Sequence, residues 1–290
     1  MARTLLYRWS TCWLLFPSFP AFAQEAHSES QFDVANPQST DIVHHGPYQT
    51  FACGGHASIV ANALDSLWTD LIIAIDSSTS NTTSPAFNAF FKTPTSAPFV
   101  TEMLTNISRG IPIMTWTSQI PHTPVLVCAF ERGVTIRVHQ QTIDMYDGCR
   151  GPLPPPTAFA IKSNHWIVLC PEFFTDIIPA TPPWQLNPPS APQDYCRKTD
   201  RLTRTLGGLL IRYKPSIVLH ELVHQYLVAS ELGRPHVQET YTFDGSLSLS
   251  ADESLENPAN YQFYVAGKSH CTYLGSRSNN EYRFRGEVLT

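Results

Sequence analysis

Hydrophobic and polar residues alternate with two different periods, which predict helices and strands in separate parts of the chain. In the stretch 54–76 (GGHASIVANALDSLWTDLIIAID), apolar residues recur every three or four positions after paired glycines. This spacing predicts an amphipathic helix. The stretch 96–108 (SAPFVTEMLTNIS) predicts a shorter helix in the same way. We also expect helices at 200–213 and from Pro215 onwards, because a proline in a first turn loses no helical hydrogen bond.

Short runs of β-branched and apolar residues lie between these helical stretches. The runs 123–130 (TPVLVCAF) and 133–139 (GVTIRVH) predict two strands separated by the turn ERG. The run 164–170 (NHWIVLC) predicts a buried strand. Helices, a small sheet and then further helices indicate an α+β fold that is mainly helical, with a small antiparallel or mixed sheet.

The first 23 residues have the order of features found in a secretory signal peptide. Arg3 and Arg8 precede the apolar run TCWLLFPSF, and the small residues AFA end at Ala23. A membrane span needs roughly 18 apolar residues, and Arg8 and two prolines interrupt this run. By the same criterion we expect no membrane span further along the chain. We therefore predict a secreted protein with no membrane partner, divided into a signal peptide (1–23), a polar N-terminal segment (24–50) and a single domain (51–290).

The overall charge narrows the classes of partner. The chain has 19 Lys and Arg residues against 24 Asp and Glu residues, a formal net charge of −5. Nucleic acids and anionic membrane surfaces attract basic proteins, so both are poor partners for this chain. We expect a monomer without a nucleic-acid partner.

Cysteine usage agrees with an oxidising compartment. Of the seven cysteines, Cys12 would leave with the signal peptide, and an even set of six remains. An even set in an exported protein predicts three disulfides, whose connectivity the sequence leaves open. We favour the pair Cys149–Cys170, because the chain between them is short. The six cysteines are Cys53, Cys128, Cys149, Cys170, Cys196 and Cys271.

Two sequons predict sites for surface glycans in a eukaryotic secretory pathway. They begin at Asn81 (Asn-Thr-Thr) and Asn106 (Asn-Ile-Ser).

The stretch SIVLHELVHQYLVAS contains the pattern H-E-x-x-H at His220, Glu221 and His224. Positions i and i+4 share one face of a helix, so both histidines can bind one metal ion. Glu221 lies about 100° further round the helix, where it can act on a metal-bound water without being a ligand. The metzincin continuation of the motif is absent, because Leu227 and Ser230 occupy its glycine and histidine positions.

Together with its surroundings, this motif resembles a known family of peptidases. The succession IVLCPEFF, VLHELVHQYL and NPANYQFYVAG, preceded by FNAFFKTPTSAPFVTEMLTNIS, is similar to the fungal deuterolysin-type metalloendopeptidases. These enzymes, also called aspzincins, include lysine-specific relatives. The resemblance extends from about Cys53 to Gly267 and implies a zincin-like fold with an H-E-x-x-H active-site helix.

The resemblance also implies a function and a cofactor. We expect a secreted zinc metalloendopeptidase that acts on a protein or peptide substrate. His220 and His224 would bind Zn²⁺, and Glu221 would act as the general base that takes a proton from water.

The third ligand is the open part of this site. The family uses an aspartate in a Gly-Thr-x-Asp-x-x-Tyr-Gly motif, whereas the corresponding stretch here reads ELGRPHVQETYTFDGS. Glu239 best matches an acidic ligand upstream of an aromatic residue, and Tyr241 can supply the phenol that Phe243 lacks. The alternatives for the third ligand are His236, Asp244, Glu253 and Glu256.

A second hypothesis is a secreted zinc-binding protein or surface antigen that derives from a peptidase and hydrolyses nothing. In that case His27, His44 and His45 would add weak metal sites near the N-terminus. The two hypotheses differ in whether the purified chain cleaves a protein substrate.

Overall fold

The structure is a computed structural model. It describes residues 42–114, 121–138, 141–150, 155–162, 164–175, 213–229, 239–270, 272–277 and 281–285. The predicted signal peptide 1–23 and the predicted helix 200–213, except Tyr213, lie outside these residues.

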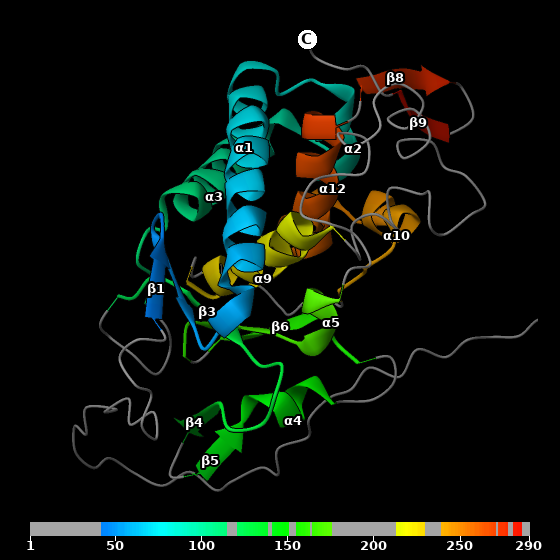
Figure 1. Cartoon of the computed structure of the whole chain (residues 1–290). Coiled ribbons are helices and arrows are strands. Elements are labelled where there is room, and N and C mark those ends of the chain that lie inside the picture. Colours follow the sequence, from blue (N-terminus) through cyan, green and yellow to red (C-terminus); the bar gives the residue numbers. More distant parts are fainter. Residues whose placement is uncertain are drawn as a thin grey trace, which may run out of the picture.

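A five-stranded mixed sheet has the strand order β1–β2–β3–β7–β6 (Figure 1). Strands β2, β3 and β7 are parallel to one another, whereas β1 and β6 at the edges are antiparallel to their neighbours. Parallel neighbours need a long crossover connection, and helices form the connection between β2 and β3. The strands are β1 (Ile42–His45), β2 (Tyr48–Phe51), β3 (Val125–Cys128), β6 (Ala158–Ile161) and β7 (Trp166–Leu169).

Strands β3 and β7 have buried side chains on both faces of the sheet, as is typical of parallel strands. Leu126 and Leu169 point to the helical layer, and Val127 and Val168 point to the opposite face. All four residues of β7 are buried, which confirms the predicted buried strand.

The two strands at the start of the sheet lie in a stretch that the sequence assigned to the polar N-terminal segment 24–50. Tyr48 is fully buried, and β2 pairs with β3, so residues from Ile42 onwards belong to the sheet. Gly46 makes the turn between β1 and β2 with a φ of +56°. The ring of Trp68 fills the space that a side chain at Gly46 would need. Strand β1 is exposed and half of its residues are histidines, so the hydrophobic pattern of the sequence did not predict a strand there.

Helices cover one face of the sheet (Figure 1). The long helix α1 packs against α3, α12 and α9, and α9 also contacts β6. The predicted helices at 54–76 and 96–108 are confirmed as α1 and α3. The main helices are α1 (Ala57–Ser80), α2 (Pro85–Phe91), α3 (Ala97–Arg109), α9 (Lys214–Ala229) and α12 (Pro258–His270).

Helix α1 is long and apolar. Within the described residues, Gly54–Ser80 is the single helix long and apolar enough to cross a membrane by length and composition. The sequence prediction required an uninterrupted apolar run, and Asp65, Asp70 and Asp76 interrupt this helix, so the absence of a membrane partner stays a prediction. The same helix contributes Val60, Leu64 and Leu71 to the core. Helices at the centre of a core can pass this test because they are apolar around much of their circumference.

A smaller unit covers the opposite face of the sheet. Its two-stranded sheet β4–β5 leads into helix α4 (Figure 1), whose Met145 and Cys149 belong to the same buried cluster as Val127 and Val168. The unit is formed by β4 (Thr135–Val138), β5 (Gln141–Asp144) and α4 (Met145–Cys149).

Two disulfides fasten these layers. Cys149–Cys170 joins α4 to the end of β7, which confirms the favoured pair. Cys53–Cys128 joins the chain just after β2 to the end of β3, 75 residues away in sequence. Cys196 and Cys271 lie outside the described residues, so the predicted third disulfide stays a prediction.

Short elements complete the described chain. They are η2 (Gly54–His56), η3 (Pro94–Ser96), α5 (Pro171–Phe174), α10 (Phe243–Ser248), α11 (Ala251–Glu256), β8 (Thr272–Arg277) and β9 (Glu281–Arg285). The whole is an α+β fold with a small mixed sheet, which confirms the predicted class.

Candidate metal centre

Helix α9 carries the HELVH sequence through the middle of the fold. It begins at Lys214, with Pro215 in its first turn as predicted. Its side chains from Lys214 to Val223 are all buried. Since α9 packs against α1, α12 and β6, its polar residues lie among apolar neighbours.

Hydrogen bonds from two buried side chains, Gln225 and Tyr213, fix the position of α9. The amide nitrogen of Gln225 donates to the carbonyl oxygens of Ile161 and Trp166, at 3.2 and 2.9 Å. At the other end, the Tyr213 hydroxyl donates to Asp70 on α1 at 3.1 Å. The helix is therefore held against both the sheet and α1.

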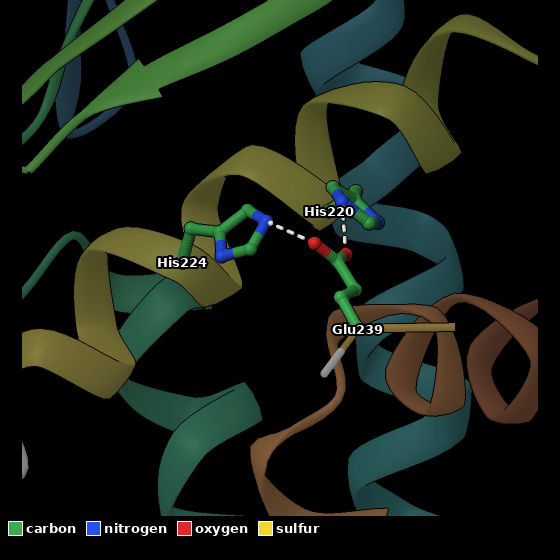
Figure 2. Close-up of side chains that lie close together, drawn as sticks. All are labelled: His220, His224 and Glu239. Carbon is green, nitrogen blue, oxygen red and sulfur yellow. Dashed lines mark ion pairs between the residues drawn. The ribbon is translucent and has the colours of Figure 1, made fainter. Parts of the chain in front are cut away.

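His220 and His224 are one turn apart on α9, and both direct Nε2 at the carboxylate of Glu239 (Figure 2). His220 Nε2 lies 2.8 Å from Glu239 Oε1, and His224 Nε2 lies 3.4 Å from Oε2. One potential ligand atom from each of the three residues falls within 4.8 Å of the others. The chain thus brings a carboxylate from outside the helix to the two histidines of the motif.

The pKa shifts of Glu239 and His220 agree with this geometry. Burial opposes the charge of Glu239, but hydrogen bonds from His220 and His224 outweigh it and hold the pKa of Glu239 well below its usual value. Burial likewise opposes the charge of His220, but the hydrogen bond with Glu239 and the charge of Glu221 raise its pKa. A cationic partner is therefore favourable at this position, as a buried carboxylate requires.

The donor set fits a metal ion. Two imidazoles and one carboxylate are the protein ligands of several catalytic zinc sites, which leave a further coordination position open. In a tetrahedral site with bonds of about 2.1 Å, neighbouring ligand atoms are roughly 3.4 Å apart. The His224–Glu239 separation of 3.4 Å matches that spacing, and the His220–Glu239 separation of 2.8 Å is somewhat shorter.

Helix α12 provides a hydrogen-bond partner for His220. The amide oxygen of Gln262 lies 3.0 Å from Nδ1 of His220, the ring nitrogen that faces away from Glu239. Ligating histidines commonly bind a protein group through their second nitrogen, which fixes ring orientation. The sequence analysis did not identify Gln262, and no motif marks this amide in a helix of mixed composition.

The remaining two predicted catalytic residues lie beside the same group. Glu221 is 7% exposed, and its negative charge helps to raise the pKa of His220. The ring of Tyr241 stacks on His220 with centroids 5.6 Å apart, and its hydroxyl donates to Glu239 Oε2 at 2.7 Å. Desolvation and the Glu239 carboxylate raise the pKa of Tyr241, so its hydroxyl remains a hydrogen-bond donor at neutral pH. Tyr241 is 62% exposed, so a large ligand can reach it.

The other candidates for the third ligand occupy different positions. Asp244 lies exposed in the first turn of α10, and Glu253 forms the capping box of α11 with Ser250. Among the described residues, the group that could hold a metal contains neither these two nor Glu256. His236 lies outside the described residues.

The N-terminal histidines form no comparable group within the described part of the chain. His45 Nε2 lies 3.0 Å from Asp65, and its ring stacks on Trp68. His44 lies on the exposed strand β1, and His27 is outside the described residues.

Comparison with known proteins adds no relative. No family model matches the chain, and no curated protein matches it.

Proposed function

We propose that this chain is a secreted zinc-dependent metalloendopeptidase with a zincin-like fold. The proposal rests on the convergence of His220, His224 and Glu239 beside Glu221, which follows His220 on the same helix. Two imidazoles, a carboxylate ligand and an adjacent carboxylate base are the parts that zinc peptidases use. The packing of α9 against β6 of a mixed sheet supports the zincin-like architecture that the sequence resemblance implies.

Each of the three ligands has a distinct contribution. Nε2 of His220 and Nε2 of His224 would hold the ion from one face of α9, and Glu239 would hold it from the facing segment. A zinc ion in such a site supplies Lewis acidity, which brings the pKa of a water to near 7 and polarises a carbonyl.

Glu221 and Tyr241 would carry the proton transfer and the charge stabilisation. Glu221 accepts a proton from the attacking water and passes it to the leaving amine, so that the amine departs neutral. The Tyr241 hydroxyl donates a hydrogen bond to the oxyanion that develops on the scissile carbonyl. The raised pKa of Tyr241 keeps that proton in place at neutral pH.

Secretion and a protein or peptide substrate belong to the same proposal. Disulfides persist in oxidising compartments, and the pairs Cys53–Cys128 and Cys149–Cys170 are compatible with export. An exposed Tyr241 at the metal group leaves room for an extended chain rather than a small enclosed ligand.

The test is hydrolysis of a denatured protein by the purified chain, after dialysis and addition of one equivalent of zinc. We expect cleavage that a chelator stops and that added zinc restores, with one zinc per chain by elemental analysis. Stoichiometric zinc without cleavage would favour the non-catalytic zinc-binding protein. Absence of zinc binding would remove both functions.

A further inference from the structure

The carboxamide of Asn257 binds both backbone groups of Thr240, the residue that follows Glu239. Asn257 Oδ1 accepts a hydrogen bond from the Thr240 N–H at 3.1 Å. Asn257 Nδ2 donates to the Thr240 carbonyl at 3.2 Å. The side chain thus pairs with Thr240 as a neighbouring strand would, although Asn257 lies between α11 and α12.

A second amide fixes the orientation of this carboxamide. Asn257 Nδ2 also donates to Asn260 Oδ1 at 2.6 Å. Asn260 in turn donates its own amide nitrogen to the carbonyl oxygens of Phe90 and Ser246, at 2.7 and 3.3 Å. Because those two acceptors claim the nitrogen of Asn260, its oxygen must face Asn257, and Asn257 must present its nitrogen there. Both carboxamides are at most 1% exposed.

We propose that Asn257 is a positioning residue for the metal centre, because it fixes the backbone at Thr240 and thereby sets the carboxylate of Glu239 opposite the two histidines. The inference rests on the proposed function, in which Glu239 is the third ligand. Consecutive Cα atoms are about 3.8 Å apart, so a fixed peptide at Thr240 leaves Glu239 little freedom beyond its own side-chain torsions. Asn257 touches no ligand atom and acts through backbone alone.

The expected loss of zinc affinity can be estimated from residues that orient metal ligands in other proteins. Loss of a partner that orients a metal ligand typically weakens metal affinity by roughly 10- to 100-fold. Loss of a hydrogen bond elsewhere in the core lowers stability without changing a ligand's position. Metal affinity therefore separates a positioning role from a structural one.

The experiment is a double-mutant cycle on zinc affinity, measured by competition with a chromophoric chelator. The four proteins are the full wild-type chain, Asn257→Ala, Glu239→Ala and the double variant. We expect Asn257→Ala to weaken zinc binding by roughly 10- to 100-fold in the wild-type background and by less than threefold in the Glu239→Ala background. Equal losses in both backgrounds, or no loss in the wild-type background, would overturn the proposal.

Two further variants serve as controls. Tyr264→Phe removes a buried hydrogen bond from the neighbouring helix α12, donated to the Ala74 carbonyl at 3.2 Å, and should leave zinc affinity unchanged. Asn257→Asp keeps an acceptor for the Thr240 N–H but loses the bonds that Nδ2 donates to Thr240, Ser246 and Asn260, so it should also weaken zinc binding. It takes the place of Asn257→Ala if the alanine variant does not fold, and unchanged zinc affinity in a folded Asn257→Asp protein would overturn the proposal.

The cycle measures binding of zinc rather than turnover, so it is separate from the test of peptide hydrolysis. A chain that shows the expected cycle and cleaves no peptide would contradict the proposed peptidase and leave the role of Asn257 intact. If the chain cleaves peptides but Asn257→Ala weakens zinc binding equally with and without Glu239, the proposed peptidase would stand. The positioning role of Asn257 would then be contradicted.

Discussion

The carboxamide of Gln262 connects His220 to the carbonyl of Ser216, one turn earlier on α9. Gln262 donates its amide nitrogen to Ser216 at 2.8 Å and places its oxygen 3.0 Å from Nδ1 of His220. Because the nitrogen is committed to a carbonyl, the oxygen accepts a hydrogen bond from Nδ1–H. With Nδ1 holding its proton, Nε2, the atom that faces Glu239, is the nitrogen that can exchange its own proton for a metal ion.

Gln262→Leu should weaken zinc binding by roughly 10- to 100-fold, because His220 loses the acceptor that sets its tautomer and ring orientation. Chelator competition measures the change. Gln225→Leu is the matched control, since Gln225 is also a buried amide and its contacts are carbonyls of the sheet. The control should lose stability and retain zinc, and equal losses of affinity in both variants would contradict the role of Gln262.

Glu239→Ala should lower zinc affinity by at least about tenfold, because the site loses its one carboxylate ligand. Asp244→Ala provides a comparison with a nearby exposed acid on α10. Zinc retained after dialysis, measured by elemental analysis, reports the outcome. If Asp244→Ala loses the metal and Glu239→Ala retains it, the ligand assignment is wrong.

Glu221→Gln should retain zinc and lower kcat by roughly 100- to 10,000-fold, since a carboxamide keeps the shape of the side chain but cannot accept a proton from water. Both quantities can be measured on one preparation. Unchanged turnover would remove Glu221 from the mechanism, and loss of zinc would indicate a ligand instead of a base.

Tyr241→Phe should lower kcat by roughly 10- to 1,000-fold with little change in zinc content, because the variant keeps the stacked ring and lacks the hydroxyl donor. Tyr146→Phe on α4 serves as the control for loss of a phenol remote from α9. A Tyr241→Phe protein with full activity would mean that another group stabilises the oxyanion.

His165 should make stability depend on pH. It is 2% exposed, and burial together with the neighbouring His122 lowers its pKa to about 4, from 6.5 in the unfolded chain. The unfolded chain therefore takes up a proton between pH 6.5 and pH 4 that the folded protein does not. Stability is full above about pH 6.5 and declines by about 2–3 kcal/mol as the pH falls to about 4.

His165→Asn tests this dependence, because asparagine tolerates the backbone φ of +56° at this position and does not titrate. Urea unfolding at pH 7 and pH 4.5 gives the loss of stability for each protein. We expect a smaller loss for the variant than for the wild-type chain. Equal losses would show that other groups cause the dependence.

Local patterns in the sequence were sufficient for part of the site. The four-residue spacing of His220 and His224 in an apolar stretch predicted that both lie on one face of a helix. That helix is α9. Glu239 was preferred because an acidic residue precedes an aromatic one in the family, and the fold brings it to both histidines. The disulfide Cys149–Cys170 followed from short loop length.

Local patterns in the sequence did not identify the residues that hold the ligands in place, Gln262 and Asn257. Gln262 and Asn257 act through contacts across 42 and 17 residues of sequence, which depend on how α12 packs. A single amide has no period and no motif, so its partner is fixed only by tertiary structure. The pairing of β2 with β3 also depends on tertiary structure, because it joins Gln49 to Val125 across a connection made of helices. No local pattern in the sequence predicts it.

The disulfide Cys53–Cys128 closes that crossover into a covalent ring at the ends of β2 and β3. Helices α1, α2 and α3 all belong to the ring. A single nick anywhere in residues 54–127 would therefore leave one molecule, with both new ends still tied to the sheet. On a non-reducing gel the nicked chain would run near its original mass, and only a reductant would release the two fragments. One cut within this ring therefore leaves the chain covalently whole for as long as the disulfide is oxidised.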